Sequence, residues 1–250
     1  MKKFGLIGHP IEHSLSPALF KAGYGGKHRY DLIQAADFEE AYARFLEGYD
    51  GINVTAPFKE LAIKKADILS KECQAIGATN LLIKTPEGIK AHNSDYLGLR
   101  LWIEKIAIPE SKVLVVGLGG AGKAATQAAR SSGHQVILMN RTRYSEDIRP
   151  LSEFREAFRE ADIIIYNLPV RLPELDLLGQ EDFMEGKRKI ILEANYRNPS
   201  FDKELIQKLE AIHPPLEYTG GEIWLLMQAL TGYEIFTGEK PDLEKMAARL

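Results

Sequence analysis

The chain carries the spacing G-x-G-x-x-G near its middle, with glycines at positions 117, 119 and 122. An apolar run, Lys112–Val116, precedes this segment, and a run of helix formers at residues 123–130 follows it. In this setting the first glycine permits a tight turn, the second lets the backbone approach a pyrophosphate, and the third allows close helix–strand packing. The helix start adds free N–H groups and a positive dipole end, which predicts a dinucleotide site rather than a glycine-rich turn without a ligand. The residues predicted to hold the dinucleotide here are Gly117, Gly119, Gly120, Ala121 and Gly122.

The end of the next predicted strand, Gln135–Met139, indicates which dinucleotide is bound. A site that prefers NAD usually has Asp or Glu there, about 20 residues beyond the glycines, to bind the ribose 2′-hydroxyl. This chain has Asn140, Arg141, Thr142 and Arg143 instead. A guanidinium pairs well with a phosphate through parallel N–H donors, so this strand end favours NADP over NAD. The alternative is that Arg141 and Arg143 are solvated loop charges.

Polar residues in the first hundred positions also stand beside predicted strand ends or helix starts. They are Ser16, Thr55, Lys59, Asn80 and Asp95. In open α/β sheets ligands bind at the carboxyl ends of strands, so Thr55 and Lys59 are expected to line a cleft. A hydroxyl beside a helix start, as at Ser16, suits a substrate carboxylate. The simpler alternatives are helix N-caps for Ser16 and Asp95, a solvated side chain for Lys59 and a turn residue for Asn80.

A lysine and an aspartate beside a nicotinamide could perform proton transfer at a carbonyl. Hydride transfer to a ketone builds negative charge on the oxygen, and an ammonium group such as that of Lys59 can stabilise that charge and donate a proton. Lysine is protonated at neutral pH, and a nearby carboxylate such as Asp95 favours and orients the charged form. In the oxidising direction the same lysine would act in its neutral form.

Short apolar runs and helical patterns alternate along the chain, which is typical of an α/β fold. The predicted strands are residues 4–7, 30–33, 51–54, 81–84, 89–91, 112–116, 135–139, 163–166 and 189–192. The predicted helices lie near residues 17–24, 38–46, 58–69, 96–106, 223–236 and 242–249. Residues 167–186 are rich in loop-forming types, and residues 108–111 form a predicted domain boundary.

The composition excludes several classes of protein. The chain has 250 residues and a formal net charge of −3, so no nucleic-acid-binding surface is expected. A single cysteine, Cys73, excludes an internal disulfide and a cysteine-based zinc site. His9 and His13 are four residues apart, but Pro10 argues against a helix there, so no metal is expected. The sequence shows no signal peptide and no apolar run of roughly 20 residues, and we expect a cytoplasmic protein without membrane partners.

Taken together, these segments resemble the shikimate dehydrogenase family. Its opening motif G-x-P-x-x-H-S-x-S-P is similar to residues 8–17, and its N-V-T-x-P-x-K segment is similar to residues 53–59. The other matching segments, in the family's order, are residues 77–80, 93–98, 117–122, 140–142 and 220–229. The resemblance covers the chain nearly from end to end, and its specificity lies in the ordered set rather than in any one motif.

The resemblance implies a fold, a reaction and a role for each matching residue. Residues 1–108 would form a substrate-binding lobe, residues 109–222 a Rossmann lobe that binds NADP, and residues 223–250 would return to the first lobe, with the active site between the lobes. The reaction would be the reversible, NADPH-dependent reduction of 3-dehydroshikimate to shikimate, by a monomer or a homodimer. Lys59 would be the acid/base catalyst with Asp95 as its partner, and Gly221 would lie near the nicotinamide. The residues implied to bind the substrate are Ser14, Ser16, Thr55, Asn80, Tyr196 and Gln228.

Some positions depart from the family pattern. The loop N-A-T-P-x-G is replaced by Asn167-Leu168-Pro169-Val170, and Trp224 stands where methionine is usual. In the segment Asp-x-x-Tyr, Glu193 takes the place of Asp, and Pro199 follows Tyr196 one residue late. The alternatives are a quinate/shikimate dehydrogenase that uses NAD, a non-catalytic NADP-binding regulator on the same fold, and another two-lobed NADP enzyme such as a methylenetetrahydrofolate dehydrogenase. Retention of Lys59 and Asp95 argues against the regulator, and the N-terminal serines do not suit the last of these.

Overall fold

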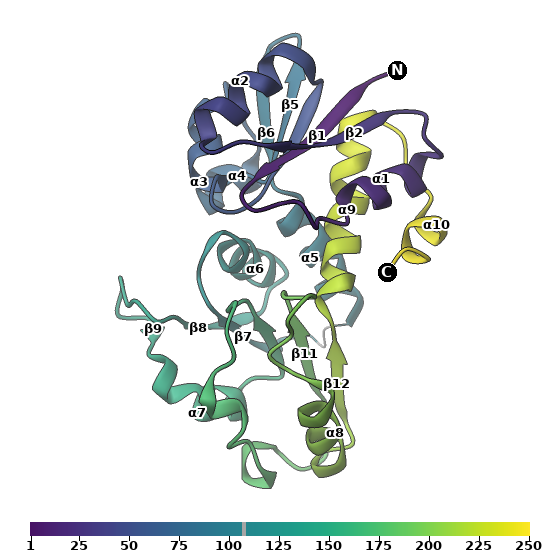
Figure 1. Cartoon of the computed structure of the whole chain (residues 1–250). Coiled ribbons are helices and arrows are strands. Elements are labelled where there is room, and N and C mark those ends of the chain that lie inside the picture. Colours follow the sequence, from purple (N-terminus) through teal and green to yellow (C-terminus); the bar gives the residue numbers. More distant parts are fainter. Residues whose placement is uncertain (107–108) are drawn as a thin grey trace. The chain divides into compact units, whose positions relative to one another are not determined.

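The chain forms two compact units in a computed structural model that describes residues 1–106 and 109–250 (Figure 1). Unit 1 consists of Met1–Leu99 together with Leu225–Leu250, and unit 2 consists of Arg100–Trp224. Ile108, at the predicted domain boundary, lies outside the described residues. Two helices each contribute residues to both units, namely α5 (Ser94–Ile106) and α9 (Gly221–Thr237).

Unit 1 is built on a six-stranded mixed sheet of strand order β2-β1-β3-β5-β6-β4. Its strands are β1 (Lys3–Gly8), β2 (Arg29–Gln34), β3 (Gly51–Val54), β4 (Ile68–Leu69), β5 (Leu81–Thr85) and β6 (Gly88–His92). Strand β1 pairs with β2 and β3 in parallel, whereas β5 is antiparallel to β3 and β6. The carboxyl ends of β1, β3 and β6 and the start of β5 therefore lie at one edge of this sheet.

Helices cover both faces of this sheet. They are α1 (Ser16–Tyr24), α2 (Phe38–Gly48), α3 (Lys59–Ala62), α4 (Lys71–Ile76), parts of α5 and α9, and α10 (Leu243–Ala247). One core includes Phe38, Phe45 and Ile52, and the other joins α9 and α10 to β1 and α1. In the second core the rings of Phe4 and Phe236 stack with centroids 4.7 Å apart. The apolar character of α9, drawn in yellow-green in Figure 1, is explained by this burial.

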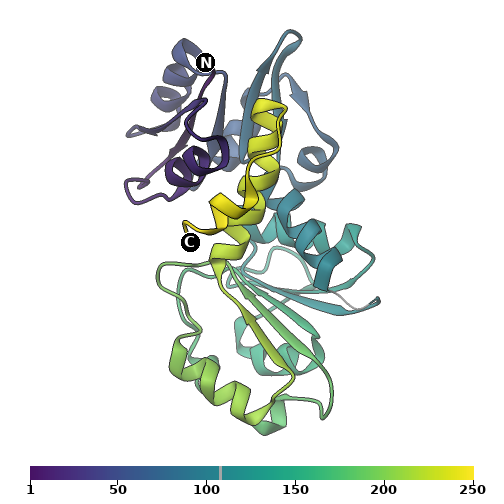
Figure 2. The same ribbon diagram turned by 90° about the vertical axis from the view of Figure 1, so that its right-hand side faces the viewer.

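Unit 2 has a six-stranded parallel sheet of order β12-β11-β10-β7-β8-β9. Its strands are β7 (Lys112–Val116), β8 (Gln135–Met139), β9 (Ile148–Arg149), β10 (Ile163–Tyr166), β11 (Lys189–Glu193) and β12 (Leu216–Thr219). Its helices include α6 (Gly120–Ser131), α7 (Phe154–Glu160) and α8 (Lys203–Ile212), the last lying beside β12 in Figure 2. Renumbered from β7, this is the 3-2-1-4-5-6 order of a doubly wound dinucleotide-binding fold. The predicted α/β class with a Rossmann-type second half is confirmed.

One predicted element is wrong. The pattern near residues 58–69 predicts one helix, but α3 ends at Ala62, a 3₁₀ turn follows over Ile63–Lys65, and β4 begins at Ile68. The cause is a non-local pairing, since the Asp67 amide donates to the carbonyl of Ile89 at 2.8 Å and the Asp67 carboxylate accepts from the Ile89 amide at 2.8 Å. Sheet hydrogen bonds to β6 thus replace the helix, a competition that local propensity does not register.

Candidate active site

The polar residues predicted in the first hundred positions all lie beside the same edge of the unit 1 sheet. Ser14 and Ser16 follow β1, Thr55 and Lys59 follow β3, Asn80 precedes β5, and Asp95 follows β6. In a mixed sheet, strands that are parallel end at one edge and an antiparallel neighbour begins there. The alternation of direction from β3 through β5 to β6 therefore gathers these residues.

Lys59 and Asp95 form a partly buried ion pair at this edge. The distance from Lys59 Nζ to Asp95 Oδ2 is 2.5 Å, and the two side chains are only 16% and 12% exposed. Asp95 lies in the first turn of α5, where the cap is supplied by Asn93, whose side-chain oxygen accepts from the amide of Tyr96 at 3.1 Å. The alternatives of an N-cap for Asp95 and a solvated side chain for Lys59 are therefore wrong. An ammonium and a carboxylate in such contact can hold and transfer a proton.

Ser94 connects Asn80 to Gln228 in a buried hydrogen-bond chain. The Ser94 amide donates to Asn80 Oδ1 at 2.6 Å, Asn80 Nδ2 donates to the Ser94 hydroxyl at 3.0 Å, and that hydroxyl donates to Gln228 Oε1 at 3.2 Å. This close approach of α5 and α9 needs Gly98, because a Cβ atom there would be 2.6 Å from the backbone nitrogen of Gln228. Ser94 was not predicted as a site residue. Its position directly before Asp95 is the signal that could have indicated it.

Ser14 and Ser16 lie together after β1. Ser14 Oγ donates to Ser16 Oγ at 3.1 Å and accepts from the amide of Ser16 at 3.3 Å. Ser16 is the first residue of α1 and Leu15 holds the cap position, so the predicted N-cap role of Ser16 is wrong. The Ser14 hydroxyl satisfies a free N–H group at the helix start instead, because it accepts from the backbone amide of Ser16. Two hydroxyls beside a helix start can bind an anion such as a carboxylate.

Further polar side chains lie beneath this edge. Tyr30 donates its hydroxyl to Asn53 Oδ1 at 2.8 Å, and Asn53 Nδ2 donates to the carbonyl of Asn80 at 3.3 Å. The Thr55 side chain lies against Gly8, where an added Cβ would be 2.2 Å from Thr55 Cγ2. Tyr30 and Asn53 were not predicted, although an asparagine within an otherwise apolar strand was a visible signal. Both residues fix the backbone that carries Asn80.

The carboxylate of Glu72, which lies beside the turn between β6 and α5, has a strongly lowered pKa. Burial raises the pKa of Glu72, but hydrogen bonds from His92, Ser70 and its own backbone outweigh burial and bring the pKa to about 2. Glu72 Oε1 lies 3.3 Å from His92 Nδ1 and 3.5 Å from the amide of Asn93. The ionised carboxylate thereby fixes the residue that caps α5 and precedes Asp95.

In unit 2 the glycine-rich turn has the geometry that a pyrophosphate needs. Gly117 has a φ of +86°, in the left-handed region that favours glycine. A Cβ atom at Gly122 would lie 1.9 Å from the carbonyl oxygen of Gly117, whereas one at Gly119 would meet nothing within 4 Å. The turn is thus closed on the protein side and open where a phosphate would approach the N-terminus of α6. These residues fit a dinucleotide.

The strand end after β8 is joined to this turn. Asn140 Oδ1 accepts from the amide of Leu118 at 3.2 Å, and Asn140 Nδ2 donates to the carbonyl of Thr142 at 2.9 Å. Arg141 and Thr142 are exposed, and the exposed Arg143 donates from Nε to the carbonyl of Ile148 at 2.7 Å. No carboxylate occupies positions 140–143. The basic end fits the 2′-phosphate of NADP.

The loop after β10, which departs from the family pattern, is anchored by its own residues. The hydroxyl of Tyr166 donates to the carbonyl of Val170 at 2.7 Å and accepts from the amide of Leu172 at 3.1 Å. Leu168 lies over the glycine-rich turn, because a Cβ atom at Gly117 would be 2.9 Å from Leu168 Cδ2. Its side chain therefore forms an apolar wall beside the turn.

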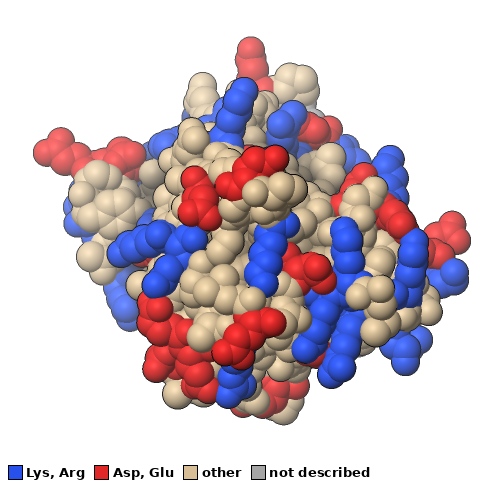
Figure 3. All heavy atoms as spheres, turned by 90° about the horizontal axis from the view of Figure 1, so that it is seen from above, with Lys and Arg blue, Asp and Glu red and all other residues tan. Residues whose placement is uncertain are grey.

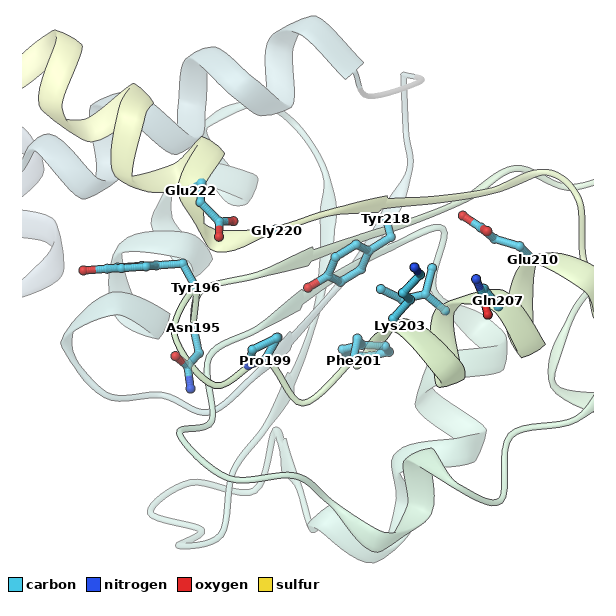
Figure 4. Close-up of a pocket in the computed structure, with 11 residues that line it drawn as sticks. Asn195, Tyr196, Pro199, Phe201, Lys203, Gln207, Glu210, Tyr218, Gly220 and Glu222 are labelled. Atoms are coloured by element: carbon cyan, nitrogen blue, oxygen red, sulfur yellow. The ribbon is translucent and has the colours of Figure 1, made fainter. Parts of the chain in front are cut away.

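Tyr196 and Gly221 are neighbours at the other side of unit 2. A Cβ atom at Gly221 would be 2.5 Å from the Ala194 carbonyl oxygen and 2.9 Å from the Tyr196 amide nitrogen. A cavity of about 430 Å³ opens beside them, and Figure 4 shows the Tyr196 ring pointing to the side opposite Lys203. Trp224 is 5% exposed and its Nε1 atom has no hydrogen-bond partner among the described residues. The close contact of Gly221 with the Ala194 carbonyl and the Tyr196 amide explains why position 221 is a glycine.

Figure 3 shows basic and acidic side chains interspersed on the displayed face, and the formal net charge is −3. Within residues 1–106 and 109–250, no three His, Cys, Asp or Glu side chains come together as metal ligands would. In the same described ranges, no helix has the length and apolar character required to cross a membrane.

A Rossmann-type unit with a basic strand end, and an α/β unit with a Lys–Asp pair, define a two-unit NAD(P)-dependent oxidoreductase. The family model for the shikimate dehydrogenase substrate binding domain matches residues 6–82, and that for the NAD binding domain of D-isomer specific 2-hydroxyacid dehydrogenase matches residues 90–210. A shikimate dehydrogenase (NADP(+)) of Thermus thermophilus is 31% identical, with 100% of this chain and 98% of the relative covered. The chain belongs to the shikimate dehydrogenase family.

Two further comparisons agree with this assignment. The crystal structure of the Thermus thermophilus shikimate 5-dehydrogenase in complex with NADP(H) and shikimate has a TM-score of 0.80 and 28% identity, and covers 100% of this chain and 98% of that chain. The pentafunctional AROM polypeptide of Candida tropicalis is 31% identical over 84% of this chain, which spans only 13% of that longer polypeptide.

Proposed function

We propose that this protein is an NADP-dependent shikimate dehydrogenase, which interconverts shikimate and 3-dehydroshikimate. The observation that carries the proposal is the ion pair of Lys59 and Asp95, 2.5 Å apart at the sheet edge of unit 1. The similarity to a structure that holds NADP(H) and shikimate supports the choice of both ligands. We assign substrate binding to residues 1–108 with the C-terminal helices from 223 onward, and cofactor binding to residues 109–222.

The residues of unit 1 would hold the substrate by its polar groups. Ser14 and Ser16 would bind the carboxylate, because both hydroxyls lie at the start of α1. Thr55, Asn80 and Gln228 would bind ring hydroxyls or the carboxylate end, and the Ser94 bridge holds the side chains of Asn80 and Gln228 in place. From unit 2, Tyr196 would contact the substrate.

The turn of unit 2 would hold NADP through Gly117, Gly119, Gly120, Ala121 and Gly122 at the pyrophosphate. Asn140, Arg141, Thr142 and Arg143 would bind the adenosine 2′-phosphate, with Gly221 beside the nicotinamide. When bound, NADPH supplies the hydride that reduces the substrate carbonyl.

Lys59 would supply the proton. As the carbonyl carbon is reduced, its oxygen gains negative charge, and the Lys59 ammonium stabilises this charge and donates a proton to that oxygen. Asp95 orients the ammonium and favours its charged form. In the reverse direction the neutral amine accepts the hydroxyl proton as the hydride leaves the same carbon.

A steady-state assay of the purified protein tests the proposal. We expect turnover of shikimate with NADP⁺ to exceed that of quinate, and NADP⁺ to be preferred to NAD⁺. Higher turnover of quinate with NAD⁺ would instead assign the chain to the quinate/shikimate branch, and no turnover of either would indicate the non-catalytic regulator. A cytoplasmic location and a monomeric or homodimeric state stay predictions, which fractionation and light scattering can check.

A further inference from the structure

Glu193 is a buried carboxylate of unit 2 that the proposed reaction does not use. Glu193 is the last residue of β11 and is 0% exposed. Oε1 accepts from the amide of Ser200 at 2.5 Å, and Oε2 accepts from the amide of Phe201 at 3.1 Å and from the hydroxyl of Tyr218 at 3.0 Å. Three donors directed at one carboxylate offset part of the cost of its removal from water, although burial still raises the pKa of Glu193.

These hydrogen bonds close the loop that carries Tyr196. The loop, residues 194–199, leaves β11 directly after Glu193 and returns to it at Ser200. Within the loop, Asn195 Oδ1 accepts from the amides of Arg197 and Asn198, at 3.1 and 3.2 Å. The loop is therefore fixed at its base by Glu193 and internally by Asn195.

The same carboxylate also joins this loop to the turn before α9. Tyr218, which donates to Glu193, belongs to β12, and β12 leads through Gly220 into Gly221. Gly221 in turn packs on the Ala194 carbonyl and the Tyr196 amide. Figure 4 shows the Tyr218 hydroxyl directed toward the side on which Asn195 and Pro199 lie. One buried group thus connects both backbone segments expected to border the substrate and the nicotinamide.

Two departures from the family pattern meet at this position. The family pattern has Asp at the end of the strand and Pro two residues after the tyrosine, whereas this chain has Glu193 and a Pro199 displaced by one residue. A glutamate extends its carboxylate by one more C–C bond, about 1.5 Å, than an aspartate does. The longer side chain reaches the amides of Ser200 and Phe201 across the 194–199 loop.

We propose that Glu193 is a positioning residue, which sets the place of Tyr196 for substrate binding by closing the 194–199 loop against Tyr218. The inference rests on the proposed function, because it takes Tyr196 as a substrate contact. The hydrogen-bond network and the burial are properties of unit 2 itself. Glu193 acts through Tyr196 and does not touch the reacting atoms.

The test compares Glu193→Gln and Glu193→Asp with a matched control, Glu217→Gln. Glu217 also lies on unit 2, on β12, but its carboxylate forms an exposed ion pair with Arg188. We expect Glu193→Gln to raise the KM for shikimate about tenfold, with kcat changed less than about threefold and the KM for NADP⁺ unchanged. Glu193→Asp should act in the same direction, since the shorter side chain cannot reach both amides. The control should leave all three constants unchanged.

A double-mutant cycle with Tyr196→Phe separates positioning from a general loss of stability. If Glu193 acts through Tyr196, Glu193→Gln raises the KM no further in the Tyr196→Phe background. Additive effects, or an unchanged KM in Glu193→Gln, would overturn the proposal. Hydrogen exchange of the free protein gives a second measurement, in which Glu193→Gln should accelerate exchange over residues 194–201 and not over β7. Faster exchange in a protein without shikimate turnover would reject the proposed function and retain the loop closure, whereas unchanged exchange rejects the closure itself.

Discussion

The Nζ atom of Lys59 lies 2.5 Å from the Oδ2 atom of Asp95, although the two residues follow different strands of the unit 1 sheet. Lys59 begins α3 after β3, and Asp95 lies in the first turn of α5 after β6. Backbone contacts fix both ends of the pair, since Thr79 donates its amide to the carbonyl of Lys59 at 3.3 Å and Asn93 caps α5. Backbone contacts at the sheet edge thus help to place both partners of the pair.

Replacing Lys59 should abolish most of the activity. We expect Lys59→Ala to lower kcat for shikimate oxidation by roughly 10²-fold or more, because the proposed acid/base would be lost. Lys65→Ala is the matched control in the same unit, because Lys65 forms an exposed ion pair with Glu39 at 2.9 Å and should be replaceable without loss of kcat. Steady-state kinetics with NADP⁺ would measure both, and undiminished turnover in Lys59→Ala would refute the catalytic assignment.

Two glycines of the nucleotide turn should respond differently to alanine. Gly119 has a φ of −69°, and a Cβ atom there meets nothing within 4 Å, so Gly119→Ala should leave the stability of unit 2 within about 0.5 kcal/mol. Its methyl group would occupy the space that we propose the pyrophosphate approaches, and the Kd for NADP⁺ should rise about tenfold or more. Gly122→Ala places a Cβ atom 1.9 Å from the Gly117 carbonyl oxygen and should cost roughly 1–3 kcal/mol of stability.

Calorimetric titration with NADP⁺ and thermal unfolding distinguish these two effects. Equal losses of stability in both variants would show that Gly119 is needed for packing and would remove the support it gives to the phosphate site. Unchanged NADP⁺ affinity in a stable Gly119→Ala protein would place the pyrophosphate elsewhere.

The sequence allowed the edge residues to be predicted wherever a general rule of chain topology applied. Thr55 and Lys59 follow a buried strand, and ligands of open α/β sheets gather at strand ends. The glycine-rich turn was predicted for the same reason, since its motif is a local pattern with a local meaning. The prediction of one helix near residues 58–69 was wrong because Asp67 forms hydrogen bonds with Ile89. No local pattern reveals a partner 22 residues away.

The contacts that complete the site depend on such distant partners. Ser94 was missed because its function appears only when α9 brings Gln228 to it, 134 residues further along the chain. Glu193 was visible as a departure from a pattern, but its donors come from residues 200 and 201 and from β12. Polar groups at strand ends can be predicted from local rules, whereas the groups that hold them in place are known only after the elements have packed.

Glu72 should contribute to stability in a pH-dependent way. Its pKa of about 2 lies below the usual value of 4.5, so its contribution is fully present above about pH 4.5 and is lost as the pH falls toward 2. Each unit of such a shift corresponds to about 1.4 kcal/mol, so the shift from 4.5 to about 2 makes about 3.5 kcal/mol an upper bound for the contribution. Glu72→Gln should therefore lower the stability at pH 7 by about 1–3 kcal/mol and flatten the loss of stability between pH 4.5 and 2.

Urea unfolding followed by circular dichroism at pH 7 and pH 3 would measure this effect. Glu39→Gln is the control, because the Glu39 side chain is 70% exposed and forms only a surface ion pair with Lys65. This substitution should change the stability by less than about 0.5 kcal/mol at either pH. If Glu72→Gln matched this control, the turn that carries Asn93 and Asp95 would be stable without the buried carboxylate.

Met246 should anchor the C-terminal helix α10 to unit 1. Met246 is 0% exposed and belongs to the core that contains Phe4, Phe20 and Phe236. Its sulfur also packs closely on Gly23 of α1, where an added Cβ atom would lie 3.0 Å from it. Met246→Ala should lower the stability of unit 1 by about 2–5 kcal/mol, because it removes a large side chain from a packed core and leaves a cavity.

The matched control for Met246 is Leu243→Ala in the same helix, since Leu243 is 41% exposed and its loss should cost less than about 0.5 kcal/mol. Because this core also includes residues of α9, the helix that bears Gln228, a loosened core should raise the KM for shikimate as well as lower the urea midpoint. Urea unfolding and steady-state kinetics on the two variants would decide between these outcomes. Equal midpoints for Met246→Ala and Leu243→Ala would mean that α10 does not stabilise unit 1, and a lowered midpoint with an unchanged KM would mean that Gln228 is positioned by α5 and Ser94 alone.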